Sequence, residues 1–315
     1  MSTAPRFSRR KALQRAVLFG AAASLRGTLI ANTLRAAEAG GMRTSPDVPL
    51  AGVRKAYGDG PFGQVHYRYA GDRALKEVPL LCLHASPLSG IVYDHWLAEM
   101  GKDRFVVAPD TPGYGGSDTP PTPPRIEDLA DAMIGFMDSV GLPTVDVMGY
   151  HTGSLISADL AMRYPGRIRK VVMISAPIFD AAIIEEYSGR IYDPPPALAD
   201  VLASTAEGLR KNGRGMFRDM TEERYADVSI ERLRHFRTSN WGFRAAFAYD
   251  LKKALREIEQ PILILNPEDD LWELTPRAKP YLNNGRIHDL PGWTHGHLDR
   301  HTEAMATIVR AFLAE

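Results

Sequence analysis

The sequence has little of several features that would assign a protein to a class. It contains one cysteine, Cys82, in 315 residues, which excludes an intramolecular disulfide framework and a CxxC metal site. It has no internal repeat, and its low-complexity sequence is confined to the proline-rich segment Thr119–Pro124. It also lacks an excess charge of either sign, since 38 Lys and Arg residues balance 38 Asp and Glu residues. This balance argues against a nucleic-acid-binding protein and against an acidic tail.

The N-terminal segment has an apolar stretch, Ala16–Leu25, of about ten residues, which is too short to span a bilayer as a helix. No stable membrane anchor is therefore expected. The preceding Ser8–Leu13 contains paired arginines and resembles a twin-arginine export signal, and Ala37–Ala39 fits a small-x-small cleavage site. The resemblance implies a bacterial protein that the export machinery carries, already folded, to the periplasm or the medium. A disordered basic arm or a transit peptide is the alternative.

The balanced charge is then the average of two unlike parts. Residues 1–39, the predicted signal peptide, contain seven basic residues and one acidic residue. The rest of the chain has 31 basic and 37 acidic residues, a net charge of −6. A moderately acidic mature protein is expected to bind a small molecule and not nucleic acid.

From about residue 50, short apolar runs alternate with helical segments. Val65–Tyr69 alternates in polarity and predicts an early antiparallel strand, and Ile126–Val140 and Ser154–Tyr164 predict helices. Continuous apolar runs, typical of buried parallel strands, occur at Pro79–Leu83, Phe105–Ala108, Val145–Met148, Val171–Ile174 and Ile262–Leu265. This alternation predicts an α/β fold with a mostly parallel central sheet flanked by helices.

Residues 178–255 break the alternation, because they have helical character, a Pro194–Pro196 run and little strand character. A helical insertion in such a series predicts a cap over the carboxyl edge of the sheet, where open α/β sheets bind ligands. The expected organisation is a core of residues 50–177 and 256–315 with a cap of residues 178–255. Aromatic residues of the cap can line a pocket or pack the cap onto the core; they are Phe236, Trp241, Phe243, Phe247 and Tyr249.

Gly149–Gly153 reads Gly-Tyr-His-Thr-Gly between a predicted strand and a predicted helix. This is the Gly-x-nucleophile-x-Gly pattern of a nucleophile elbow, and it resembles the α/β-hydrolase fold. The glycines are needed because a Cβ on either side of so tight a turn would clash. The tip residue, which is Ser, Cys or Asp in most of these proteins, is here His151.

The resemblance extends over roughly residues 50 to 315. Four further segments follow predicted strands where the family has its oxyanion loop, a second loop, its acid and its histidine: Leu83–Pro87, Pro109–Asp118, Asn266–Asp270 and Gly292–His295. The motifs occur in the family's order. They imply the α/β-hydrolase fold with a helical cap and a hydrolase that needs no cofactor.

Site residues follow from the resemblance. It implies His295 as the base and Asp270 as the acid that orients it. His297 is the alternative base, but a place on the rim or the surface is expected for it. Asp269, and after it Glu268, are the alternatives to Asp270.

The resemblance also implies an oxyanion hole, formed by the backbone N–H groups of Ser86 and Thr152. The start of the helix after Thr152 adds a positive end. His84 is expected to hold its loop by hydrogen bonds. Neither Ser154, at the start of a helix, nor Cys82, inside a strand, is expected to replace the tip residue as nucleophile.

Three interpretations of His151 remain open. A neutral imidazole can attack a carbonyl carbon to give an acyl-imidazole, or it can act as a base for water or for a lyase-type proton transfer. The protein can also be a binder that has lost turnover. A fourth possibility is a zinc ion held by His151, His295 and either His84 or His297. The prediction is an esterase-like hydrolase of an ester, lactone or similar carbonyl bond, with His151, His295 and Asp270 as a variant triad.

Overall fold

The computed structural model describes residues 50, 52–187, 197–210 and 217–315. The predicted export signal, residues 1–39, lies outside this part of the chain, so export stays a prediction. No helix in the described part is long and apolar enough to cross a membrane.

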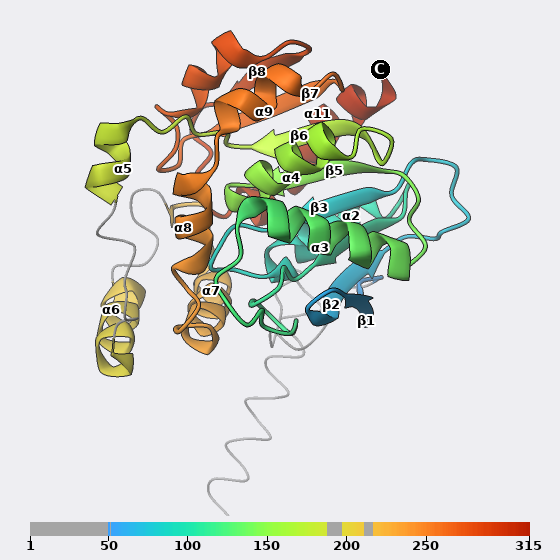
Figure 1. Cartoon of the computed structure of the whole chain (residues 1–315). Helices are drawn as coiled ribbons and strands as arrows, with labels where there is room; N and C mark the ends of the chain where they lie inside the picture. Colours follow the sequence, from blue (N-terminus) through green and yellow to red (C-terminus); the bar gives the residue numbers. More distant parts are fainter. Residues whose placement is uncertain (1–49, 51, 188–196, 211–216) are drawn as a thin grey trace, which may run out of the picture. The chain divides into compact units, whose positions relative to one another are not determined.

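The described residues form an eight-stranded sheet with the order β1-β2-β4-β3-β5-β6-β7-β8 (Figure 1). The first two strands are antiparallel to each other and β2 is antiparallel to β4, while the remaining pairs are parallel. The strands are β1 (Arg54–Gly60), β2 (Gly63–Ala70), β3 (Leu80–Leu83), β4 (Val106–Pro109), β5 (Val145–Tyr150), β6 (Ile168–Ile174), β7 (Ile262–Pro267) and β8 (Gly285–Leu290). The fold class and the mostly parallel sheet predicted from the sequence are confirmed.

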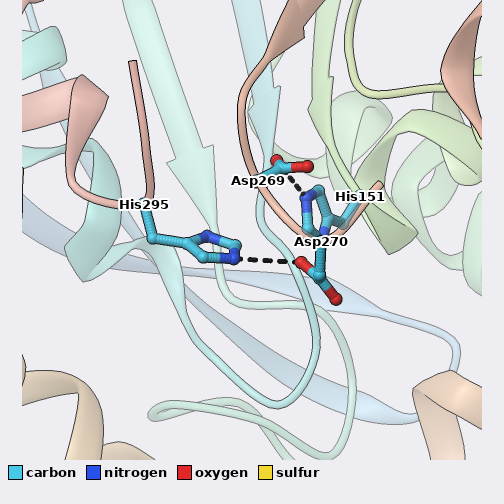
Figure 2. Close-up of side chains that lie close together, drawn as sticks. All are labelled: His151, Asp269, Asp270 and His295. Carbon is cyan, nitrogen blue, oxygen red and sulfur yellow. Dashed lines mark hydrogen bonds and ion pairs between the residues drawn. The ribbon is translucent and has the colours of Figure 1, made fainter. Parts of the chain in front are cut away.

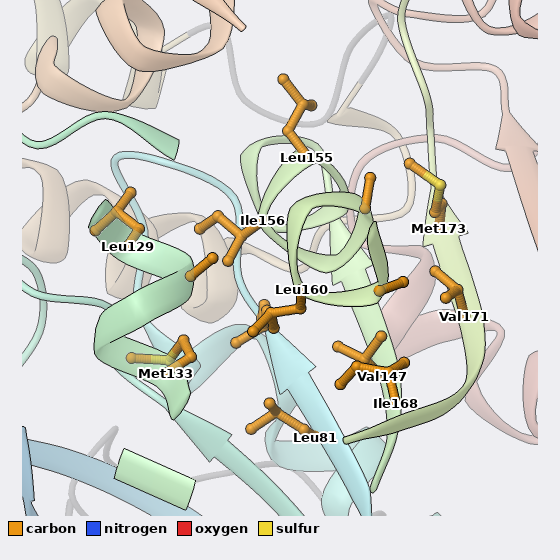
Figure 3. Packing of buried hydrophobic residues seen from close by; sticks show 14 of the residues in the cluster. Leu81, Leu129, Met133, Val147, Leu155, Ile156, Leu160, Ile168, Val171 and Met173 are labelled. Atoms are coloured by element: carbon orange, nitrogen blue, oxygen red, sulfur yellow. The ribbon is translucent and has the colours of Figure 1, made fainter. Parts of the chain in front are cut away.

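Both faces of the sheet are covered, which explains why its strands are continuously apolar. Leu81 of β3 and Val147 of β5 pack in one core with α3 (Ile126–Ser139) and α4 (Thr152–Arg163) (Figure 3). The helix α9 (Leu251–Glu257) contributes to the same core. Cys82 and Met148, the neighbours of Leu81 and Val147 in the chain, point to the other face. There they pack with α2 (Asp94–Met100) and α11 (Thr302–Ala314).

The chain between β6 and β7 is helical in its described residues and contains no strand there. Its helices are α5 (Ala181–Tyr187), α6 (Leu198–Arg210), α7 (Glu222–Arg234), α8 (Trp241–Ala248) and α9. The last of these packs against α4 on the sheet, whereas α7 and α8 contribute residues to the pocket described below. Shorter helices lie elsewhere: η1 (Gly90–Tyr93), η4 (Thr275–Tyr281) and α10 (His297–Arg300).

The strand order reverses around β3, since β4 lies on one side of it and β5 on the other. Loops that leave the carboxyl ends of β3 and β5 therefore diverge and open a crevice between them. The predicted oxyanion loop follows β3, and the predicted elbow follows β5. The strand order thus brings these two motifs to one place.

Candidate active site

The elbow has the strained backbone that its sequence pattern predicts. His151 has φ 50° and ψ −108°, a positive φ that non-glycine residues rarely adopt. A Cβ at Gly149 would lie 2.2 Å from the carbonyl oxygen of Gly153, and one at Gly153 would lie 2.0 Å from that of Leu83. Glycine at both positions lets β5 and α4 meet closely and leaves the His151 side chain at the tip.

His151 is hydrogen-bonded to Asp269, in the loop after β7, with 2.7 Å between Nε2 and Oδ2 (Figure 2). The Asp269 carboxylate also accepts from the Ser175 hydroxyl at 3.1 Å and from the backbone N–H of Leu271 at 2.8 Å. A carboxylate so placed only accepts hydrogen bonds. Nε2 of His151 therefore carries a proton, and in the neutral ring the lone pair is on Nδ1.

The two groups of this dyad shift each other's pKa. Burial by itself would lower the pKa of His151, but the charge and hydrogen bond of Asp269 outweigh it and raise that pKa above its ordinary value. Burial likewise opposes the charged form of Asp269, yet His151 holds the pKa of that carboxyl below its usual range. The dyad thus favours an imidazole that readily takes up positive charge.

His295 forms a second dyad with Asp270, with 3.0 Å between Nε2 and Oδ1 (Figure 2). The other nitrogen, Nδ1, is hydrogen-bonded to the hydroxyl of Tyr150. Phe217, which precedes α7, stacks on the His295 ring with 5.1 Å between centroids. The structure therefore brings together His295 and Asp270, as predicted from the sequence. It places Asp269, the alternative partner of His295, on His151 instead.

Both dyads border a pocket of about 530 Å³ between the loops of the sheet and the helices α7 and α8. Ser86 lines this pocket, and Thr152 is the buried first residue of α4 beside it. Their role as oxyanion donors stays a prediction. Apolar side chains make up much of the remaining wall; they include Leu88, Val92, Phe217, Met220, Val228, Phe243 and Leu298. Of the cap aromatics named from the sequence, Phe243 lines this pocket.

Three further residues considered for the site from the sequence are hydrogen-bonded or buried away from the two dyads. Nε2 of His84 accepts a hydrogen bond from the backbone N–H of Thr111 at 2.9 Å, so His84 links two loops. The hydroxyl of Ser154 is buried and hydrogen-bonded to the carbonyl of Gly149 at 3.0 Å. Cys82 is fully buried, and burial raises the pKa of its thiol far above the usual range.

His297, expected on the rim or the surface, is buried, with 1% of its surface exposed. The expectation is wrong because residues after His295 turn inward into α10, where Nδ1 of His297 donates to the carbonyl oxygen of Thr294 at 2.9 Å. Burial lowers its pKa to about 4, so it stays neutral.

The spacing of the dyads is one that a metal ion can bridge. One donor atom from each of His151, Asp269, Asp270 and His295 lies within 4.8 Å of the others, and imidazole and carboxylate ligands suit zinc. His84 and His297, offered by the sequence as a third histidine ligand, are not part of this group.

Three features of the site are not predicted by the sequence: the hydrogen bond between Asp269 and His151, the hydrogen bond from Ser175 to Asp269, and the contact of Tyr150 with His295. Tyr150 lies in the elbow, immediately before His151, and the sequence does show a polar hydroxyl on the last residue of a buried strand. Ser175 follows β6 and has a positive φ of 62°. Such backbone strain is visible only in the structure.

Comparison with known proteins places the chain in a family. A family model described as the alpha/beta hydrolase family matches residues 80–308. The chain is 30% identical over 102 residues to 2-hydroxymuconate semialdehyde hydrolase of Pseudomonas sp. (strain CF600), a match covering 31% of this chain and 36% of that protein. It is 22% identical to mouse bifunctional epoxide hydrolase 2, over 74% of this chain and 51% of that protein.

Among solved structures, the enol-lactonase from Burkholderia xenovorans LB400 superimposes with a TM-score of 0.68 at 22% identity, covering 82% of this chain and 100% of that one. At this identity the likeness shows the fold alone. The chain spans between about a third and a half of the length of the two curated relatives. The relatives are hydrolases, and they support a small-molecule hydrolase at the level of the family.

Proposed function

We propose that this chain, which belongs to the alpha/beta hydrolase family, hydrolyses an ester, lactone or similar carbonyl bond with His151 as nucleophile. One observation carries the proposal: at the elbow, His151 points into a pocket with Nε2 hydrogen-bonded to Asp269 at 2.7 Å. This bond leaves the lone pair of the neutral ring on Nδ1. The elbow position also sets the side chain beside the N-terminus of α4, where an oxyanion is stabilised.

Acylation begins when Nδ1 of His151 attacks the carbonyl carbon of the substrate. The new C–N bond pushes the carbonyl electrons onto oxygen, which accepts hydrogen bonds from the backbone N–H groups of Ser86 and Thr152. Positive charge develops on the ring, and Asp269 stabilises it through Nε2–H. Collapse of the intermediate expels the alcohol as its alkoxide, which takes a proton from solvent, and leaves an acyl group on Nδ1.

Deacylation uses the second dyad. An acyl-imidazolium is an activated acyl group, so water hydrolyses it readily once a base removes a proton. His295, oriented by Asp270 at 3.0 Å, is that base. The products are the carboxylic acid and the free enzyme.

One observation favours a second mechanism for the same hydrolysis. The Asp269 carboxylate outweighs the effect of burial and raises the pKa of His151, as it would for a general base that activates water directly. In that case no covalent intermediate forms. A cofactor-free lyase would use the same proton transfer.

The test is to trap the intermediate with a slowly hydrolysed activated ester and to locate it by mass spectrometry of peptides. We expect one acyl group per chain on His151, and neither adduct nor turnover in His151→Ala. His288→Ala, an exposed histidine on β8, is the matched control and should behave as the unmodified protein.

Other results would point elsewhere. Full turnover by His151→Ala would remove this histidine from the reaction. Turnover that depends on His151 but never gives an adduct would favour the general-base mechanism. Tight binding without turnover across a panel of esters and lactones would indicate a binding protein.

A further inference from the structure

Tyr150 lies where the two dyads meet. It is the last residue of β5 and immediately precedes His151. It is 5% exposed, yet it lines the pocket. Its ring centroid is 4.5 Å from that of His151 and 6.2 Å from that of His295. A group on this ring can therefore reach both histidines.

Neither ring nitrogen of His295 is left open to a water molecule. Asp270 accepts from Nε2–H, so Nδ1 has the lone pair, and the Tyr150 hydroxyl donates its proton to that lone pair. One face of the ring is covered by Phe217 at 5.1 Å. If His295 is the base of deacylation, a proton from water reaches it through the Tyr150 hydroxyl.

We infer that Tyr150 is a catalytic residue that contacts the attacking water and relays its proton to His295. The inference rests on the proposed function, because the attacked group is an acyl group on His151. The Tyr150 ring contacts the rings of both histidines, and the ring centroids of His151 and His295 are 5.4 Å apart. The relay therefore places the attacking water beside the Tyr150 hydroxyl, next to the acyl group on His151. Tyr150, His295 and Asp270 form a hydroxyl–histidine–carboxylate series like that of a serine triad. In the proposed step, a water molecule precedes the hydroxyl in this series.

The step balances. A water O–H bond breaks as its proton passes to the Tyr150 oxygen, and the proton of Tyr150 passes to Nδ1 of His295. The water oxygen forms a bond to the acyl carbon. The C–N bond to His151 then breaks, its electron pair returns to Nδ1 of His151, and the carboxylic acid leaves. The proton on His295 returns to solvent, and Tyr150 is neutral throughout.

The surroundings of Tyr150 suit a relay that stays protonated. Burial, with the nearby carboxylates of Asp269, Asp270 and Asp299, raises the pKa of this phenol well above its usual range. His297 packs edge-on against the ring with 5.3 Å between centroids. Since His297 is buried and neutral, it holds the ring without competing as a base.

The experiment compares Tyr150→Phe with the unmodified protein on an activated ester, by burst kinetics and intact mass. Because Phe keeps the ring and removes the relay, we expect a normal burst of one acyl group per chain and a steady-state rate lower by about 100-fold or more. Acylated enzyme should accumulate on His151. Tyr69→Phe removes a hydroxyl on β2, outside the pocket, and should behave as the unmodified protein.

Two results would overturn the inference. One is wild-type steady-state turnover in Tyr150→Phe, and the other is loss of the burst together with turnover. Deacylation of the unmodified protein in mixtures of H2O and D2O supplies a second measurement that does not depend on the variant folding. If two protons are transferred in the rate-limiting step, the deacylation rate should depend on the deuterium fraction along a curve. A straight line would contradict the relay.

The site of the adduct and the rate of its release distinguish failure of the relay from failure of the proposed function. If the unmodified protein forms no adduct on His151, or forms one on Tyr150, then the proposed function fails and the relay with it. If the adduct forms on His151 and Tyr150→Phe releases it at the wild-type rate, only the relay fails.

Discussion

Two consecutive aspartates serve two different histidines. The Asp269 side chain is fully buried and bonded to His151, whereas that of Asp270 is 22% exposed and bonded to His295. Adjacent side chains in a tight loop point in different directions, so one loop after β7 supplies both dyads. Each histidine consequently has its own carboxylate, whereas a serine triad needs only one.

Removal of the Asp269 charge should shift the pH dependence of acylation. The imidazolium of His151 has no lone pair and cannot attack. Acylation should therefore rise with pH through a pKa that Asp269 holds above the ordinary histidine value. In Asp269→Asn this midpoint should move to lower pH, and the rate on its plateau should fall by roughly 10²–10⁴-fold because the tautomer is no longer held. The measurement is the burst rate as a function of pH.

Asp59→Asn is the control, because Asp59 is an exposed carboxylate on β1. It should leave both midpoint and rate unchanged. A midpoint in Asp269→Asn that stays in place or rises would mean that the titrating group is not His151.

At the scale of elements, the site depends on how closely β5 and α4 approach β3. The N-terminus of α4 lies against the carbonyl oxygen of Leu83, and only a residue without Cβ fits at Gly153. The same approach brings the start of α4 beside the predicted oxyanion loop, because a Cβ at Gly153 would also lie 3.0 Å from the carbonyl oxygen of His84. Packing of these elements thus decides both stability and the geometry of the site.

Gly153→Ala should disrupt this junction. Its methyl group would lie 2.0 Å from the Leu83 oxygen, so strand and helix must separate, at a cost of about 3 kcal/mol in the free energy of unfolding. Turnover should fall with it, because the oxyanion donors move. Urea denaturation and steady-state kinetics measure the two effects.

Gly166→Ala is matched to this variant, because a Cβ there meets nothing within 4 Å. It should change the free energy of unfolding by less than about 0.5 kcal/mol. Equal stability of the two variants would show that the close approach at Gly153 is not rigid.

At the scale of the molecule, an ion pair made by the buried Arg224 connects the helix α7 to the core. Arg224, 5% exposed, donates to both carboxylate oxygens of Asp299 at 2.8 and 2.9 Å and to the carbonyl of Ile91 at 2.9 Å. Nearby, the Asp219 carboxylate accepts from the backbone N–H of Thr294 at 2.7 Å. Thr294 immediately precedes His295, so the segment between β6 and β7 also positions the proposed base.

Arg224→Met should lower the free energy of unfolding by about 3–5 kcal/mol, because Asp299, whose side chain is 10% exposed, and the buried Asp227 then lose the arginine with which they pair. Arg224→Met combined with Asp299→Leu should cost clearly less than the single change, since the carboxylate that loses two hydrogen bonds is then gone as well. Arg210→Met, on the exposed end of α6, should have almost no effect. Chemical denaturation measures all three, and a double variant as unstable as the single one would contradict the ion-pair account.

Local patterns in the sequence determined the fold class and the elbow with His151 at its tip. They also predicted that His295 pairs with Asp270. Apolar runs and glycines act over a few residues, so they can be read without knowing the rest of the structure. Tertiary structure alone decided that Asp269 bonds His151 across 118 residues and that Tyr150 bonds His295 across 145. The reason is that these contacts join loops from different strands. Their geometry follows from the strand order, which places the ends of β5, β7 and β8 on one edge of the sheet.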